Sequence, residues 1–143
     1  MWVIRKGCTP AFPGQEGFVG ATMGEPSVIL RGVESDAGPN LLYSTVHGAG
    51  RVMSRTQAAG KWRRKGGRRV QVRPGAIDFR SVRARLAGQG IELRGGAADE
   101  APGAYKRLDH VLAAHGDTIE IVHRLAPIGV AMAGADTFDP YKD

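Results

Sequence analysis

The chain has 143 residues, of which 42% are hydrophobic, and its formal net charge at pH 7 is +6. This length suits one domain with a modest core, and the hydrophobic content is too high for a disordered tail. The single cysteine, Cys8, excludes an internal disulfide, so a reducing cytoplasm is the expected compartment. No apolar run is long enough to span a bilayer, and Arg5 and Lys6 interrupt any signal-peptide pattern.

Short strands separated by turns are predicted for the first third of the chain, at residues 1–4, 18–21 and 27–33. Pro10 and Pro13 indicate a loop over residues 9–15, and Gly24 indicates a turn before the third strand. Hydroxyl groups at Thr22 and Ser27 could donate hydrogen bonds to a phosphate. An ordinary polar turn explains the same two residues.

The most informative segment runs from residue 41 to residue 55. Residues 41–46 predict a buried strand, which His47 and a Gly-Ala-Gly turn connect to a helix. Backbone N–H groups at a helix start suit a phosphate, and Gly48 and Gly50 leave room for a ligand beside the backbone. A neutral imidazole at position 47 could then attack phosphorus. A hydrogen-bonded structural histidine fits these residues as well.

A strongly basic segment follows, at residues 61–73, with seven basic residues and no acidic one. The remainder of the chain holds 13 basic and 14 acidic residues, so the whole positive excess lies here. We expect a short helix ending at Gly60, and then a hairpin with Gly66 and Gly67 at its tip. Such a patch, with Trp62 to stack on a base, suits RNA, although a solvated hairpin has the same composition.

The second half predicts short helices and strands. Asp78 is placed to cap a helix over residues 79–86, and Pro102 suits the start of another helix. Tyr105 has the helical spacing of a core residue relative to Leu108 and Leu112. Strands are expected at residues 90–94, 118–125 and 128–132. The expected fold class is therefore α+β, with a strand-rich layered core and short helices, in a single domain over residues 1–143.

Five motifs occur in order along almost the whole chain. They are Arg5-Lys6-Gly7-Cys8-Thr9, Gly20-Ala21-Thr22-Met23-Gly24 with Ser27, Val46-His47-Gly48-Ala49-Gly50-Arg51-Val52-Met53-Ser54-Arg55, Asp99-Glu100-Ala101-Pro102 with Tyr105-Lys106, and Pro127-Ile128-Gly129-Val130. Together they resemble the RtcB family of RNA-splicing ligases, over the C-terminal portion of a family chain only. The resemblance implies the C-terminal, nucleotide-binding part of the RtcB-like fold. Gly20, Ala21 and Thr22 depart from the family's proline, glycine and serine.

The resemblance implies a ligase that joins RNA 3′-phosphate or 2′,3′-cyclic phosphate ends to 5′-hydroxyl ends, in tRNA splicing or RNA repair. His47 would carry GMP from GTP as a covalent intermediate, and Arg51 and Arg55 would hold the RNA phosphate. The other matched positions would bind the nucleotide: Gly20, Ala21, Thr22, Met23, Ser27, Gly48, Ala49, Gly50 and Tyr105. Tyr105 fits a core-facing aromatic equally well.

Two parts of the family pattern are missing. The family's terminal lysine, which contacts guanine, falls at Met132 here, and Lys142 is the candidate replacement, although a frayed terminal lysine fits too. The family's manganese ligands lie upstream, and no residue of this chain is assigned to metal. The resemblance thus implies GTP, Mn²⁺ with ligands outside this chain, RNA, and the missing upstream part as a separate chain, without a membrane.

We therefore expect the isolated chain to lack the metal site and to be unable to ligate RNA, as a truncated product or as half of a split enzyme. A non-catalytic RNA-binding remnant of such a ligase is the alternative. A small nucleotide-binding or hydrolase module acting alone would need a base, a metal cluster or a Walker-type loop, and the sequence presents none of these.

Overall fold

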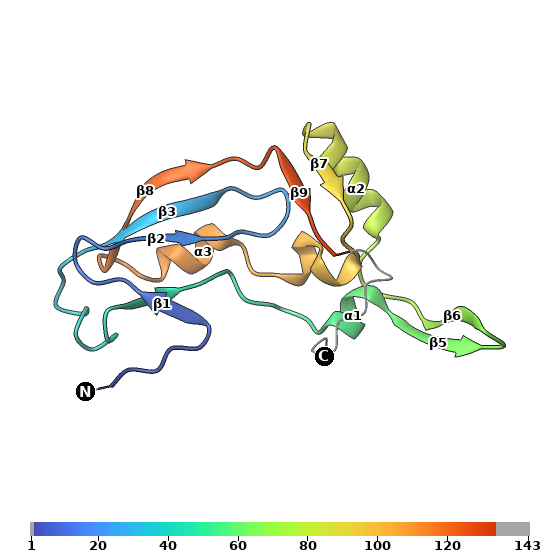
Figure 1. The fold of residues 1–143 in the computed structure, drawn as a ribbon, viewed down its shortest axis with the longest axis horizontal. Helices are drawn as coiled ribbons and strands as arrows, with labels where there is room; N and C mark the ends of the chain where they lie inside the picture. The colour runs from blue at the N-terminus through green and yellow to red at the C-terminus, as the bar shows by residue number, and fades with distance from the viewer. Residues whose placement is uncertain (1, 134–143) are drawn as a thin grey trace. The chain divides into compact units, whose positions relative to one another are not determined.

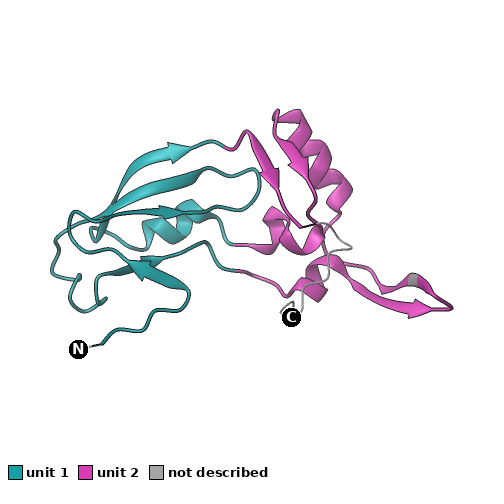
Figure 2. Cartoon of the chain, viewed as in Figure 1, with its two compact units in different colours: residues 1–50, 106–126 teal, residues 51–105, 127–143 magenta. Residues whose placement is uncertain are grey.

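The computed structural model describes residues 2–133, apart from the side chain of Arg69. The chain divides into two compact units: unit 1 is residues 1–50 and 106–126, and unit 2 is residues 51–105 and 127–143 (Figure 2). Strands and short helices occur in both, which confirms the α+β class. The single domain over residues 1–143 stays a prediction. Within residues 2–133, every helix is too short or too polar to cross a membrane.

Unit 1 is built on a three-stranded antiparallel sheet in the order β2-β3-β8, with a second pair of strands, β1-β4, and one helix, α3 (Figure 1). The elements are β1 (Cys8–Pro10), β2 (Glu16–Val19), β3 (Ser27–Gly32), β4 (Ser44–Val46), α3 (Leu108–Ala113) and β8 (Ile119–Leu125). Along β3, buried and half-buried residues alternate, as the period of a strand requires when one face meets a core. This alternation confirms the strand expected at residues 27–33.

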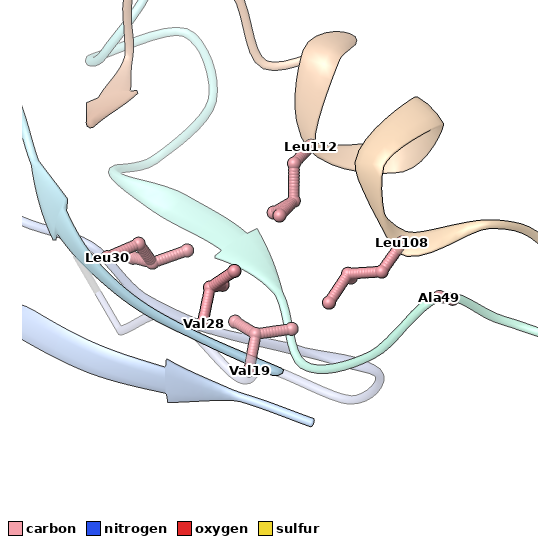
Figure 3. Close-up of a cluster of buried hydrophobic side chains, with 6 residues drawn as sticks. All are labelled: Val19, Val28, Leu30, Ala49, Leu108 and Leu112. Atoms are coloured by element: carbon pink, nitrogen blue, oxygen red, sulfur yellow. The ribbon is translucent and has the colours of Figure 1, made fainter. Parts of the chain in front are cut away.

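The core of unit 1 lies between α3 and the inner face of the sheet (Figure 3). Val28 and Leu30 point from β3 toward α3, which contributes Leu108 and Leu112 from one helix face. Each of these side chains stabilises the fold by about 1.5–3 kcal/mol through burial. Ala49 joins the same cluster, so the segment that carries His47 is anchored in the core.

Three expectations for unit 1 were wrong in detail. The strand predicted for residues 41–46 begins only at Ser44, because Leu42 and Tyr43 adopt left-handed turn conformations with φ of 53° and 46°. Residues 2–4 form no strand. The loop predicted for residues 9–15 begins instead as β1, whose pairing with β4 was not visible in the sequence.

The described residues of unit 2 form two α-helices, a two-stranded hairpin and a short parallel strand pair. Its elements are α1 (Arg55–Ala59), β5 (Lys61–Lys65), β6 (Arg68–Arg73), α2 (Phe79–Gly88), β7 (Glu92–Arg94), the 3₁₀ turns η1 (Ala98–Glu100) and η2 (Pro102–Ala104), and β9 (Gly129–Ala131). The hairpin, the end of α1 at Gly60 and the start of α2 after Asp78 are thereby confirmed. The carboxylate of Asp78 caps α2, accepting from the hydroxyl of Ser81 at 2.6 Å and from the backbone N–H of Arg80 at 3.0 Å. These hydrogen bonds lower the pKa of Asp78.

The helix expected after Pro102 is wrong at its start. Pro102 opens a single 3₁₀ turn, and α3 begins only at Leu108. Tyr105 therefore lies in extended backbone outside any helix, so its helical spacing relative to Leu108 was coincidental. This frees its side chain for the contacts described below.

The base of the hairpin is closed by a tight backbone contact at Gly75. A Cβ built there would lie 2.2 Å from the carbonyl oxygen of Ala58, a distance that real Cβ atoms do not reach. We expect Gly75→Ala to lower the free energy of unfolding by about 2–3 kcal/mol through overpacking. Gly88→Ala, at an open position at the end of α2, should raise it by about 0.5–1 kcal/mol.

Urea denaturation followed by the fluorescence of Trp62 in unit 2 measures both effects, with Trp2→Phe removing the signal of the fully exposed Trp2. Equal effects of the two alanine substitutions would contradict the packing argument.

Candidate functional site

His47 directly follows β4 in unit 1, and its side chain is exposed. The next residue, Gly48, forms an isolated parallel β-bridge with Gly20, which directly follows β2. A Cβ built on Gly7 would lie 3.8 Å from Nε2 of His47, so the imidazole stands over the backbone of a glycine. An exposed imidazole between glycine segments is accessible to a phosphate-bearing ligand.

The backbone beside His47 leaves the open space that the sequence predicted. Gly50 has φ of 76°, and a Cβ built there would meet no atom within 4 Å. At Gly48 the nearest atom would be the carbonyl oxygen of Gly20, at 3.7 Å. Ala49, between the two glycines, faces the core and is only 8% exposed. The strip therefore has one anchored residue and two residues open to a ligand.

The prediction that this glycine strip lies at a helix start is wrong. Helix α1 begins at Arg55, and its cap is Ser54, whose Oγ accepts from the N–H of Gln57 at 3.1 Å. The N–H groups of Gly48 and Gly50 thus gain nothing from a helix dipole. These glycines favour a phosphate only because they let a ligand lie close to the backbone.

The segment from Gly20 to Ser27 is a closed turn in unit 1. The hydroxyl of Ser27 accepts from the backbone N–H of Ala21 at 3.1 Å, and the N–H of Glu25 donates to the carbonyl of Thr22 at 3.0 Å. Met23 is 5% exposed, so it offers little surface to a ligand. Oγ1 of Thr22 is buried and has no hydrogen-bond partner among the residues that the structure describes. A buried hydroxyl without a partner is a position where a ligand group would be stabilising.

Unit 2 holds Arg51 in a dense set of contacts. Its guanidinium donates to the hydroxyl of Tyr105 at 2.8 Å, to the backbone carbonyl of Asp99 at 2.6 Å and to that of Met53 at 3.1 Å. The guanidinium carbon also lies 4.7 Å from the centre of the Tyr105 ring, in cation–π geometry. The bridge between the backbones of Arg51 and Tyr105 fixes this pairing.

Two carboxylates complete the same network. Arg55 pairs with Asp99 at 3.2 Å and with Glu100, and Glu100 also accepts from the hydroxyl of Tyr105 and lies 3.8 Å from Arg51. Asp99 is 4% exposed, so its charge is held away from water. Two arginines thus face two carboxylates, and a phosphate approaching Arg51 or Arg55 competes with this pairing. The sequence placed Asp99 and Glu100 in a motif but gave them no role, and no local pattern indicated that they pair with Arg51 and Arg55.

The predicted site residues therefore form two groups, one in each unit. In unit 1 the Gly20–Gly48 bridge brings His47 to the turn that holds Thr22 and Ser27. In unit 2 the network collects Arg51, Arg55 and Tyr105. Lys142 lies outside the described residues.

A separate pocket of about 720 Å³ opens in unit 1 between β1, β4 and α3. Cys8, Thr45, His110 and His115 contribute to its lining, and His47 does not. Burial lowers the pKa of His115, whose ring nitrogen lies 3.5 Å from the hydroxyl of Thr45. Within residues 2–133, no group of three or more His, Cys, Asp or Glu side chains is arranged to hold a metal ion.

Comparison with known proteins decides the family. The family model described as tRNA-splicing ligase RtcB matches residues 1–133. The chain belongs to the RtcB family. RtcB relatives include the tRNA-splicing ligase RtcB of Pyrococcus horikoshii, 36% identical over 90% of this chain and 15% of that protein.

The RNA-splicing ligase RtcB of Mycobacterium tuberculosis is 38% identical over 89% of this chain and 30% of that protein. The RNA-splicing ligase RtcB of Escherichia coli K12 is 35% identical over 90% of this chain and 27% of that protein. The chain thus spans less than a third of the length of these curated RtcB relatives. The RtcB match also takes in every described residue of both groups above.

Proposed function

We propose that the chain is the guanylyl-carrying portion of an RtcB-type RNA ligase in the cytoplasm, joining RNA 3′-phosphate or 2′,3′-cyclic phosphate ends to 5′-hydroxyl ends in tRNA splicing or RNA repair. The observation that carries the proposal is the exposed imidazole of His47, beside an open glycine strip that the core anchors. Membership of a family whose relatives are named RNA ligases supports the same assignment.

His47 supplies the nucleophile in this proposal. A neutral ring nitrogen forms a bond to the α-phosphorus of GTP, the bond to the bridging oxygen of the β-phosphate breaks, and pyrophosphate leaves. An oxygen of the RNA 3′-phosphate then attacks the same phosphorus, and the P–N bond breaks to return the imidazole. The 5′-hydroxyl of the second RNA end attacks the activated 3′-phosphate, loses its proton to solvent and releases GMP.

The groups around His47 suit a nucleotide. The backbone at Gly48 and Gly50 leaves room for its phosphates. The hydroxyl of Thr22, which has no partner among the described residues, is proposed to donate to the nucleotide once the turn opens to expose it. We propose that the neighbouring residues of unit 1 also contribute to nucleotide binding, namely Gly20, Ala21, Met23, Ser27 and Ala49. We propose Tyr105 as a further nucleotide contact, and Arg51 and Arg55 as contacts to the RNA phosphate. To bind these ligands, each side chain must give up one of its present contacts in the network of unit 2. Lys142 is proposed as the guanine contact.

Manganese does not fit the described residues, because residues 2–133 hold no cluster of metal-ligating side chains. We therefore assign no step of the reaction to Mn²⁺ in this chain and propose that its ligands come from a separate upstream portion of the ligase. A non-catalytic RNA-binding remnant is the second candidate, and the cation-rich β5-β6 hairpin favours it. RNA binding that survives His47→Ala and does not respond to GTP would support the remnant.

The test is GMP attachment with and without an upstream portion. The chain is incubated with GTP labelled at the α-phosphate and with Mn²⁺, first alone and then with the preceding segment of the Mycobacterium tuberculosis relative. We expect labelled chain only when the segment is present, because that segment would supply the metal ligands. Labelling of the isolated chain would contradict the missing metal site. A chain that stays unlabelled in both, while the intact relative is labelled in parallel, would contradict the proposed function.

A further inference from the structure

The β5-β6 hairpin of unit 2 is an exposed two-stranded ribbon (Figure 1). Its strands pair only with each other among the described residues, and every residue of β5 is exposed. Gly66 and Gly67, with φ of 56° and 75°, form the two-residue turn at its tip. At its base the indole N–H of Trp62 donates to the carbonyl of Ala59 in α1 at 3.2 Å. The ribbon is thus anchored at one end and open to solvent along its length.

The register divides the cations of the hairpin between its two faces and aligns three of them on one face. Arg63 lies opposite Val70, and Lys65 lies opposite Arg68. Because alternate residues of a strand share a face and directly opposed residues lie side by side, Arg63, Lys65 and Arg68 belong to the same face. Cations two residues apart on a strand are separated by roughly 6.7 Å. An extended polyanion lying along this face would meet them in succession.

Like charges lie opposite each other across this hairpin. Three of the five cross-strand pairs place a cation opposite a cation, which destabilises a hairpin. None of Lys61, Arg63, Arg64, Lys65, Arg68 and Arg73 forms an ion pair with a residue that the structure describes. Elsewhere, by contrast, Arg31 bridges Glu16 and Glu120, and Arg124 pairs with Asp109. A bound polyanion would relieve the repulsion that the fold leaves in place.

We propose that this hairpin is a binding surface for the phosphate backbone of RNA, without preference for base sequence; the proposal rests on the proposed RNA-ligase function. A lipid surface fits less well, because no face of the ribbon is apolar. Trp62 lies opposite Gln71 on one face, and Val70 lies among cations on the other. Phosphate contacts position a nucleic acid without reading its sequence, which suits a ligase that must hold different RNA ends.

The experiment measures RNA affinity of the full chain, without GTP, by fluorescence anisotropy of a short single-stranded RNA with a 3′-phosphate. Native chain is compared with the triple variant Arg63→Gln, Lys65→Gln, Arg68→Gln. A control triple variant, Arg80→Gln, Arg83→Gln, Arg85→Gln, removes the same charge from exposed positions of α2 in the same unit. Each single-strand phosphate contact contributes about 0.7 to the slope of log affinity against log salt.

We expect the hairpin variant to flatten that slope by about 2 and to weaken binding at least about tenfold at low salt, because three phosphate contacts are lost. The control should change the slope far less, and RNAs of different sequence should bind alike. If the triple variant fails to fold, the three single variants replace it, each expected to lower the slope by about 0.7.

Equal losses in the hairpin and control variants would overturn the proposal. So would native chain that binds anionic phosphatidylserine vesicles but not RNA, or native chain that binds neither. If one of these results is found while the chain is still labelled with GMP in the presence of the upstream segment, only the hairpin proposal is wrong. Hairpin-dependent RNA binding with no GMP labelling would remove the proposed ligase function and leave the remnant.

Discussion

Replacing His47 with alanine is expected to abolish GMP attachment to the chain, measured with α-labelled GTP in the presence of the upstream segment. A nitrogen of the imidazole forms the covalent bond to GMP in this proposal, so GMP has no attachment point once the imidazole is removed. The fold should survive, because the side chain is exposed and the neighbouring Ala49 supplies the core contact.

His110→Ala is the matched control for this variant. His110 is also an exposed histidine of unit 1, and it lies on α3 at the pocket that His47 does not line. We expect it to be labelled as fully as the native chain. Undiminished labelling of His47→Ala, or equal loss in both variants, would show that His47 is not the acceptor.

Arg51→Ala should destabilise unit 2 more than any exposed substitution. The change removes the guanidinium that donates to the carbonyl of Asp99 and the hydroxyl of Tyr105, and it leaves two half-buried or buried carboxylates facing a single arginine. Breaking a buried charged network costs about 3–5 kcal/mol, and partial exposure of Arg51 reduces this to about 2–3 kcal/mol. The midpoint of thermal unfolding should fall by about 10 °C.

Trp62 fluorescence in the Trp2→Phe background reports this loss during urea or thermal unfolding. Arg51→Lys should recover only part of it, since an ammonium cannot reproduce the fork that reaches three acceptors while lying over the Tyr105 ring. Arg80→Ala on the exposed face of α2 should change stability by less than about 0.5 kcal/mol. If Arg51→Ala also changes the free energy of unfolding by less than about 0.5 kcal/mol, the network contributes nothing to the stability of the fold.

The neutrality of this network bears on how an RNA phosphate would be held. Arg51 and Arg55 are already paired with Asp99 and Glu100, so a phosphate has to displace a carboxylate instead of meeting a free cation. The exchange carries a desolvation cost at the buried Asp99. The cations of the β5-β6 hairpin meet no such carboxylate in the part of the chain that the structure describes, so long-range attraction of RNA should depend on the hairpin more than on these two arginines.

Elements with a local chemical signal were predictable from the sequence. The Gly66-Gly67 turn between basic strands indicated the hairpin, and Asp78 ahead of an amphipathic run indicated the start of α2. In both cases the residues that specify the structure are neighbours in the chain. The family motifs likewise gave the region around His47, because their residues are contiguous.

Features made by distant residues were not predictable. An apolar run such as Leu41 to Val46 fits a strand or a turn equally, and here the left-handed residues Leu42 and Tyr43 delay the strand. The network of Arg51 depends on pairing with Asp99, 48 residues away in the sequence. Nothing in the local pattern of either segment indicates its partner. The helical spacing of Tyr105 pointed to a core position, whereas the structure places its hydroxyl among charges.

The most direct measurement is the identity of the labelled residue. The chain, labelled with GMP in the presence of the upstream segment, is digested and the adduct is located by tandem mass spectrometry, with its acid and base stability recorded. We predict GMP on the peptide that contains His47, in an acid-labile, base-stable linkage to the imidazole. GMP found on a lysine such as Lys106, or on another histidine, would contradict the account.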